Sequence, residues 1–194
     1  RAGATHTLLE RRITPASRKV VWRISMLFAV DALAGGFLGT ALLSYFFFER
    51  FGAAEATIAM LFFLARGANA ISHLAAAWLA RKIGLINTMV FTHIPASIFL
   101  MLLAAAPQFW MAVMLFLARE LLVEMDVPTR QSYVMAVVAP HERTYASGIT
   151  GLVRLGGWAS GPFIAGALMQ GVSLATPLFV GAAMKIGYDL MLWR

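Results

Sequence analysis

Apolar residues run along this chain in long stretches that short polar breaks separate. A helix that crosses the hydrocarbon core of a bilayer needs about 20 mostly apolar residues. Stretches of about that length cover residues 21–48, 54–80, 87–105, 109–138, 144–169 and 175–193. The breaks contain turn or charged residues, as in Glu49-Arg50-Phe51-Gly52 and Ala106-Pro107-Gln108. The pattern predicts an all-α polytopic membrane protein with a bundle of six transmembrane helices.

Short connections force neighbouring helices to run antiparallel, so we expect an up-and-down bundle with both termini on one side. Cytoplasmic loops carry an excess of Lys and Arg. The basic segment before residue 21, the pair Arg81 and Lys82, and Arg143 all fall on the side of the termini, whereas the other side has only Arg50. We therefore expect both termini in the cytoplasm, at the plasma (inner) membrane. Residues 1–20 are expected to form a basic cytoplasmic linker ahead of a bundle at residues 21–194.

Composition supports a membrane protein and excludes several kinds of chemistry. Of 194 residues, 60% are hydrophobic and 13% charged, which leaves too few charges for the exterior of a soluble domain. The net charge of +7 does not indicate nucleic acid, because the basic residues form no solvated stripe. Cysteine is absent from the sequence, which excludes disulfides and thiolate ligands. We expect the lipid bilayer as a partner, and no nucleic acid, cofactor or metal.

Ionisable residues inside the apolar stretches are the most informative feature. Each costs several kcal/mol in a membrane unless it is paired or hydrated. Acidic and basic residues occur there in equal numbers, which permits mutual neutralisation inside the bundle. They are Asp31, Arg66, Arg119, Glu120, Glu124, Asp126, Arg130, Arg154, Lys185 and Asp189.

Spacing along each helix suggests how some of these charges are neutralised. Residues four apart lie on one face of a helix. Asp126 and Arg130 therefore predict a local ion pair or gate, and Lys185 and Asp189 predict a pair that neutralises itself.

Glu120 and Glu124 are also four apart but carry like charge. They need partners from other helices, protonation or water, and they are the best candidates to carry a proton. Arg66, Asn69 and His73 share one polar face of the second stretch, which is expected to look inward. An interior histidine held by hydrogen bonds is the simpler interpretation of His73.

Glycines and prolines within the stretches indicate close helix packing and bending. Gly35, Gly36 and Gly39 follow one another in the first stretch, and further glycines occur throughout the fifth. Small residues let helix backbones approach closely in a membrane. Pro128 and Pro162 each remove a backbone donor and kink or soften their helix.

The segment Gly157-Trp158-Ala159-Ser160-Gly161-Pro162-Phe163-Ile164-Ala165-Gly166 resembles the GxxxGPxxGG pattern of the major facilitator superfamily, with Ala165 replacing one glycine. In that motif Gly157, Gly161, Pro162 and Gly166 would serve helix packing. The loop from Ala77 to Gly84 is similar to a degraded form of the family's GxxxDRxG loop, with Arg81 in place of the acid. Arg119 falls where the family has a fourth-span arginine.

The resemblance implies a six-helix bundle that forms half of a transporter, with a second six-helix half as partner. The basic segment ahead of the first stretch is similar to the family's central linker, which implies the C-terminal half. The implied function is secondary active transport of a small-molecule substrate by alternating access, through a proton-coupled symporter or antiporter, and not an enzyme.

Residues are assigned to this function by their depth in the stretches. The cytoplasmic gate is assigned to Arg81, Lys82, Asp126 and Arg130. Substrate or proton contacts are assigned to Asp31, Arg66, His73, Arg119, Glu120, Glu124 and Arg154.

Two other classes of function remain open. A non-transporting receptor or chaperone of the same fold would explain the degraded loop, although it gives the buried charges no role. An intramembrane protease is disfavoured, since no histidine follows His141 and His141-Glu142 lacks the second histidine of the zinc helix motif. The sequence leaves the substrate, the direction of transport and the coupling ion open.

Overall fold

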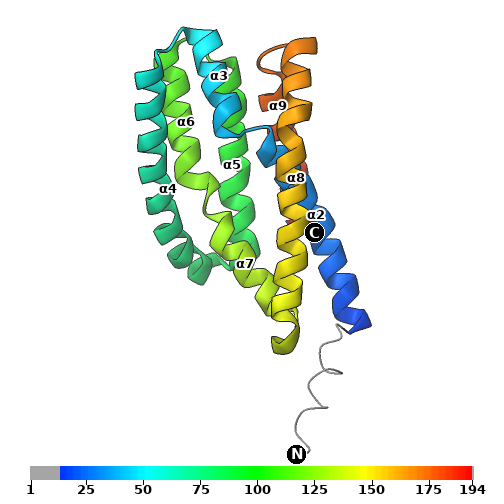
Figure 1. Cartoon of the computed structure of the whole chain (residues 1–194). Coiled ribbons are helices and arrows are strands. Elements are labelled where there is room, and N and C mark those ends of the chain that lie inside the picture. The colour runs from blue at the N-terminus through cyan, green and yellow to red at the C-terminus, as the bar shows by residue number, and fades with distance from the viewer. Residues whose placement is uncertain (1–13, 194) are drawn as a thin grey trace, which may run out of the picture.

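A computed structural model describes residues 14–193 of the chain, and every regular element in that range is a helix (Figure 1). The elements are α2 (Pro15–Gly36), α3 (Thr40–Phe51), α4 (Glu55–Ile83), α5 (Leu85–Ala105), α6 (Phe109–Val123), α7 (Asp126–Val137), the 3₁₀ helix η1 (Pro140–Glu142), α8 (Arg143–Gly171) and α9 (Thr176–Trp193). Helix occupies each of the predicted stretches, which confirms the all-α class. The first and fourth stretches are each divided between two helices.

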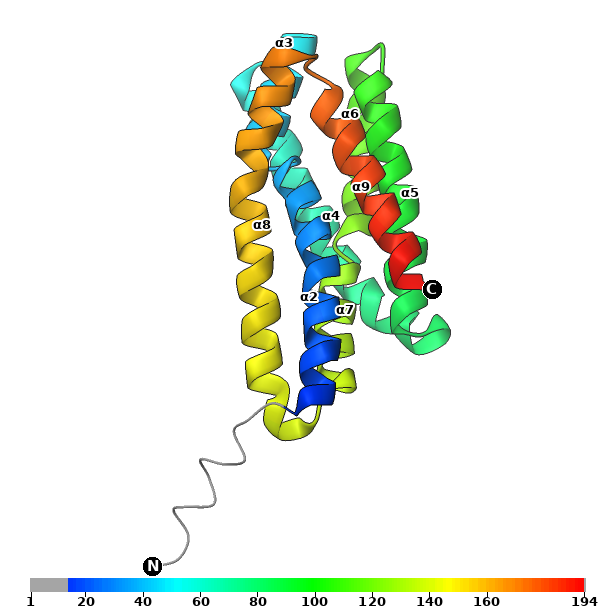
Figure 2. The ribbon, with the colours of Figure 1, turned by 90° about the vertical axis from the view of Figure 1, so that its right-hand side faces the viewer.

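Successive stretches run in alternating directions along the bundle (Figure 2). The most extensive packing joins α2 to α8, and α5 to both α6 and α9. The end of the bundle at which α2 begins is also the end at which α7 leads into α8, and α9 runs back toward it. The described residues thus have the up-and-down order that short connections predict.

Helix α2 begins at Pro15, ahead of the predicted start at residue 21. The Thr14 hydroxyl caps the helix by accepting a hydrogen bond from the Ser17 N–H at 3.3 Å, and Pro15 suits the first turn. Residues 15–20 therefore belong to the bundle and not to the expected linker, whose first 13 positions lie outside the described residues. The Thr14 N–H also donates to Glu142 Oε1 at 2.7 Å. Hydrogen bonds from the Ser17 side chain and from this N–H hold the pKa of Glu142 below its usual value.

Two apolar clusters fill the bundle, one toward each end. The upper cluster, at the end that contains α3, includes Phe46, Phe47, Leu103, Phe116 and Leu178. The lower cluster, at the end where α2 begins, includes Val21, Phe28, Met89, Val134 and Tyr188. The two clusters are separate, and polar side chains lie on the helices between them.

Charged side chains occupy that intermediate level. Asp31 of α2 stands between Phe28 of the lower cluster and Phe37 of the upper cluster. His93 of α5 and Lys185 of α9 likewise have a lower-cluster residue on one side along their helix and an upper-cluster residue on the other. All three are buried, so several helices bring charge to the same depth of the bundle.

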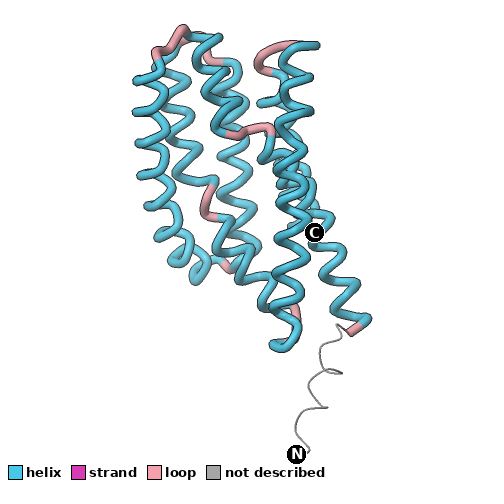
Figure 3. The backbone as a smooth tube through the Cα atoms, in the orientation of Figure 1, coloured by secondary structure: helices cyan, strands magenta, loops and turns pink. Residues whose placement is uncertain are grey.

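Two interruptions of the helices divide α2 from α3 and α6 from α7, the first higher in the bundle than the second (Figure 3). The first is at residues 37–39, between α2 and α3, where Gly36 and Gly39 flank the break. The second is at residues 124–125, between α6 and α7. The ring of Pro128 would clash with the carbonyl of Glu124, four residues earlier, which explains the position of the second break. The sequence predicted one continuous helix for each of the stretches 21–48 and 109–138. The structure divides each of them into two helices.

The outer surface of the bundle is apolar. Phe63, Leu74, Trp110 and Phe163 are among many large apolar side chains that are exposed. Water would disfavour such a surface, whereas lipid tails would not. Three helical segments are long and apolar enough to cross a membrane, namely Ser17–Phe51, Glu55–Ile83 and Leu85–Ala105. The helices of the other three stretches do not meet both conditions of length and apolar character. Helices α6 and α7 are each too short.

Glycines permit the close approach of α2 and α8. A Cβ on Gly161 would lie 2.6 Å from the Gly36 Cα, and one on Gly157 would lie 3.0 Å from the Ala29 carbonyl oxygen. Gly166 differs from the prediction for the packing motif, because a Cβ there would meet nothing within 4 Å. The reason is that α2 ends at Gly36, before α8 reaches Gly166. Pro162 lies within α8, which continues through it.

Gly161→Ala should destabilise the bundle, because the added methyl group meets backbone that has no room to yield. We expect a loss of about 1–3 kcal/mol, measured as the free energy of unfolding of the purified protein in detergent. Gly156→Ala, on the same helix with no neighbour within 4 Å, is the matched control and should be neutral or slightly stabilising. Equal losses in the two variants would contradict the close contact between α2 and α8.

Candidate functional site

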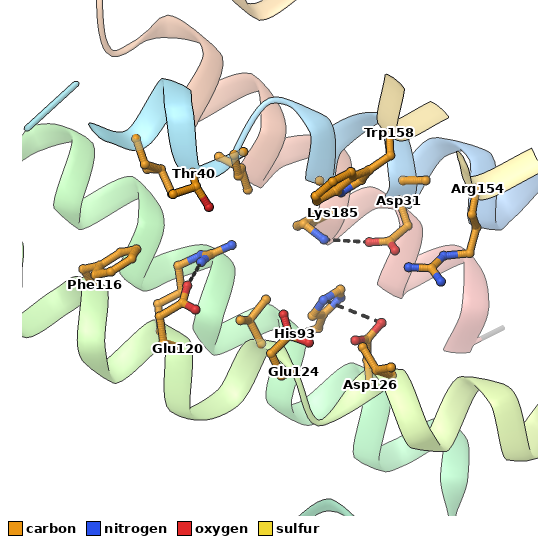
Figure 4. Close-up of a pocket in the computed structure, with 18 of the residues that line it drawn as sticks. Asp31, Thr40, His93, Phe116, Glu120, Glu124, Asp126, Arg154, Trp158 and Lys185 are labelled. Carbon is orange, nitrogen blue, oxygen red and sulfur yellow. Dashed lines mark hydrogen bonds and ion pairs between the residues drawn. The ribbon is translucent and has the colours of Figure 1, made fainter. Parts of the chain in front are cut away.

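A cavity of about 180 Å³ lies at the charged level between the two apolar clusters (Figure 4). Both helix interruptions reach it, since Leu38 and Gly39 line it from the first and Glu124 from the second. Its charged or titratable lining consists of Asp31, Arg66, His93, Arg119, Glu120, Glu124, Asp126, Arg130, Arg154 and Lys185. Most of the charges predicted from the apolar stretches thus meet in one place.

Asp31 is the centre of a buried ionic network. Its Oδ1 accepts a hydrogen bond from Lys185 Nζ at 2.7 Å, and its Oδ2 accepts one from Arg130 Nη1 at 2.8 Å. Arg130 Nη1 also lies 2.7 Å from Asp126 Oδ2, as their spacing on α7 predicts. One carboxylate therefore connects α2, α7 and α9.

Lys185 and Asp189 do not form the pair predicted from their spacing. Lys185 contacts Asp31 instead, and Asp189 Oδ1 lies 3.2 Å from His93 Nδ1. The other ring nitrogen of His93 lies 3.9 Å from Asp126 Oδ2. Ion pairs between helices replace the pair within one helix, because Asp31 and His93 approach α9 at the level of the cavity.

His93 is a site residue that the sequence analysis missed. Its side chain is almost fully buried and joins α5 to both α7 and α9. The available signal was its position in the middle of the third apolar stretch, near the buried polar residues Thr88, Thr92 and Ser97. Spacing along one helix could not reveal the two carboxylates that approach it from other helices.

A second ionic group connects α4 to α6. Glu120 pairs with its neighbour Arg119 and lies 3.7 Å from Arg66 of α4. Glu124 lies 3.9 Å from His73, which is also on α4. Each glutamate therefore has a partner from another helix, as two like charges four residues apart require.

The polar face of α4 is only partly turned inward. Asn69 is buried, whereas the side chains of Arg66 and His73 are 65% and 45% exposed. Arg66 lines the cavity from its rim, and His73 lies outside the lining. Among the described residues, the predicted inward orientation thus holds for Asn69, and Arg66 and His73 are only partly covered.

Arg154 of α8 differs from the other cavity charges. Among the residues that the structure describes, no carboxylate lies within ion-pair distance of it. Its Nε is buried and has no hydrogen-bond acceptor. Arg154 and Arg130 also line a smaller cavity of about 90 Å³ beside the first turns of α8. Arg154 thus stands between two cavities with an unused donor.

The predicted cytoplasmic gate is not assembled as one group. Arg81 and Lys82 are exposed at the last turn of α4, where the Lys82 Nζ lies 4.1 Å from the centroid of the Trp78 ring. Asp126 and Arg130 are instead buried in the network around Asp31. The structure assigns the latter pair to the cavity itself.

Lys185→Met and Asp31→Asn should each destabilise the protein by about 3–5 kcal/mol, because each leaves a buried charge with fewer partners. The double variant should lose clearly less than the sum of the two, as measured by unfolding in detergent. The cycle of Lys185→Met with Asp189→Asn is the control and should show a smaller coupling. A larger coupling in the control cycle would indicate that Lys185 pairs within its own helix.

No family model matches the chain. Over 193 residues it is 25% identical to an uncharacterized membrane protein, YJR124C, of Saccharomyces cerevisiae. The match covers 97% of this chain and 43% of the yeast protein, so the chain spans less than half the length of that relative. Together with the three long apolar segments and the apolar outer surface, this likeness supports an all-helical protein embedded in a lipid bilayer.

Proposed function

We propose that the chain is the C-terminal six-helix half of a secondary active transporter of the major facilitator type, with its substrate site at the charged cavity. The observation that carries the proposal is that two helix interruptions and a buried ionic network meet in one cavity. In this proposal all six stretches cross the plasma (inner) membrane, and both termini are cytoplasmic.

The interruptions support transport because unpaired backbone is expensive in a bilayer. Non-helical backbone is tolerated at membrane depth only where protein buries it or where it lines an aqueous cavity. Transporters use such broken helices at their substrate sites, near the midplane. Residues 37–39 and 124–125 satisfy that condition, because the breaks border the same cavity between the two apolar clusters.

The ionic network supports transport because ion pairs between helices can be exchanged. Asp31 has two cationic partners on different helices, and Arg130 has two acidic ones. A movement of α2 relative to α7 or α9 can therefore break one pair while another is kept. Such alternative pairing permits a change of shape without leaving a bare charge in the membrane.

Incomplete covering of the cavity supports a second half. Arg66 and Trp158 line the cavity and yet are largely exposed, and they come from helices far apart in the chain. The relative's additional length leaves room for another bundle of similar size. A second half placed against this side would enclose the cavity and cover the exposed charges.

The proposal is tested by measuring accumulation of labelled metabolites in a transport-deficient host, with and without a proton gradient. Accumulation is expected when this chain is expressed together with a matching six-helix half, and not when it is expressed alone. Glu120→Gln should abolish accumulation at unchanged membrane expression, because it leaves Arg66 and Arg119 without their shared carboxylate. Glu49→Gln, exposed at the end of α3, is the matched control and should retain full activity.

Two results would contradict the proposal. One is an absence of accumulation with both halves present and correctly inserted, which would favour a receptor or chaperone of this fold. The other is full accumulation by the Glu120→Gln variant, which would contradict the place of the second ionic group in the site while leaving transport itself supported.

A further inference from the structure

The buried network around Asp31 holds an unequal number of acids and permanent cations. Ion pairs join its members in the order Asp189, His93, Asp126, Arg130, Asp31 and Lys185. The three aspartates exceed the two permanent cations by one, and all six side chains are buried. A net charge buried in a membrane is strongly unfavourable. One additional proton makes the network neutral.

That proton has a definite place, which is the pair formed by His93 and Asp189. His93 is the one member that can gain a charge, and both of its ring nitrogens face carboxylates, at 3.2 Å and 3.9 Å. Asp189 is fully buried, and its Oδ2 has no hydrogen-bond partner. A proton shared by the pair removes the cost of an isolated carboxylate whichever of the two residues holds it.

Charged groups on the other helices do not change the excess of one acid in the network. The groups that face His93 are Asp126 and Arg130 from α7, Lys185, Tyr188 and Asp189 from α9, and Asp31 from α2. From α4, α6 and the break after α6, the two cations Arg66 and Arg119 equal in number the two acids Glu120 and Glu124, and Glu124 also lies 3.9 Å from His73. Arg154 is then the one permanent cation of the cavity lining without a carboxylate partner among the described residues.

We infer that the cavity binds a small organic anion, whose carboxylate pairs with Arg154, together with one proton on the His93–Asp189 pair. When the proton is bound, the network is neutral and Arg154 retains an uncompensated charge that attracts the anion. When the proton leaves, the network becomes negative and itself balances Arg154, so the anion is released. The two ligands therefore stabilise each other. This inference rests on the proposed function and specifies its substrate class.

The surroundings of Arg154 suit such a ligand. Its unused buried Nε can donate to a carboxylate oxygen, and a guanidinium can bind a carboxylate through two hydrogen bonds. Trp158, one turn further along α8, lines the same cavity and offers an apolar face to the rest of the molecule. The volume of about 180 Å³ lies below the range of drug-sized pockets, so this half favours a small anion.

The test is calorimetric binding to the natural full-length protein in detergent, with lactate, succinate and citrate as probes and with choline and spermidine as cationic comparators. At least one carboxylate should bind, and the cations should not. Arg154→Gln should weaken that binding at least about tenfold, because a charge-assisted bidentate pair is lost. Arg154→Lys should be intermediate, and Arg23→Gln, exposed on α2, should bind as the unmodified protein does.

The proton is tested with the same titrations. In the pH range in which the pair has lost its proton, binding of one anion should take up one proton, counted from the heat released in buffers of different ionisation enthalpy. Affinity should fall by about tenfold per pH unit once the pair loses its proton. Asp189→Asn, which makes the network neutral without a proton, should bind the anion with no uptake and no pH dependence. If this variant fails to fold, the count of one proton in the unmodified protein still decides the question.

Several outcomes would overturn the inference. They are binding of the cations alone, no binding by any carboxylate, equal binding by the Arg154→Gln variant, and anion binding whose affinity and proton uptake stay unchanged at every pH tested. Failure of the proposed function is distinguishable from these. Accumulation of a cationic or neutral metabolite would reject the anion while transport stands, whereas proton-linked anion binding without accumulation by both halves would leave a binding site in a protein that does not transport.

Discussion

The placement of Asp31 between Arg130 and Lys185 is the interaction on which the rest of the bundle depends. A carboxylate at this depth requires cations within contact distance, and neither cation is on its own helix. Helices α7 and α9 are therefore held against α2 at one level. The apolar clusters above and below can pack in many ways of similar energy, since hydrophobic contact has no direction. The ion pairs select one arrangement.

The helix interruptions follow from the same constraint. Leu38 and Gly39 at the first break and Glu124 at the second line the cavity that the ion pairs border. Glycine at the first break and Pro128 after the second each weaken the helix at these positions. Contact between Gly36 and Gly161 then fixes the end of α2 against α8. The tight contact between α2 and α8 thus lies directly beside the non-helical backbone of residues 37–39.

Much of the fold could be predicted from the sequence, because long apolar stretches and short breaks determine helices and their order. The set of charges at the cavity was also predictable, since each charge interrupts an apolar stretch. Their partners were not. The spacing of Lys185 and Asp189 satisfied the rule for neighbours on one helix, and yet both residues pair with other helices. His93 and the break at residues 37–39 escaped notice for the same reason, because their significance arises only where several helices converge.

A network built only for stability would not have this composition. Well-packed apolar residues of similar volume usually stabilise a protein at least as well as buried ion pairs do. The excess acid and the unpaired cation also lie on different helices, Asp189 on α9 and Arg154 on α8, and among the described residues they form no ion pair with each other. The charge of Asp189 and the charge of Arg154 can therefore each be neutralised by a ligand that binds reversibly. A proton can reach the first and an anion the second, and the charge between them makes the occupancy of one depend on the other.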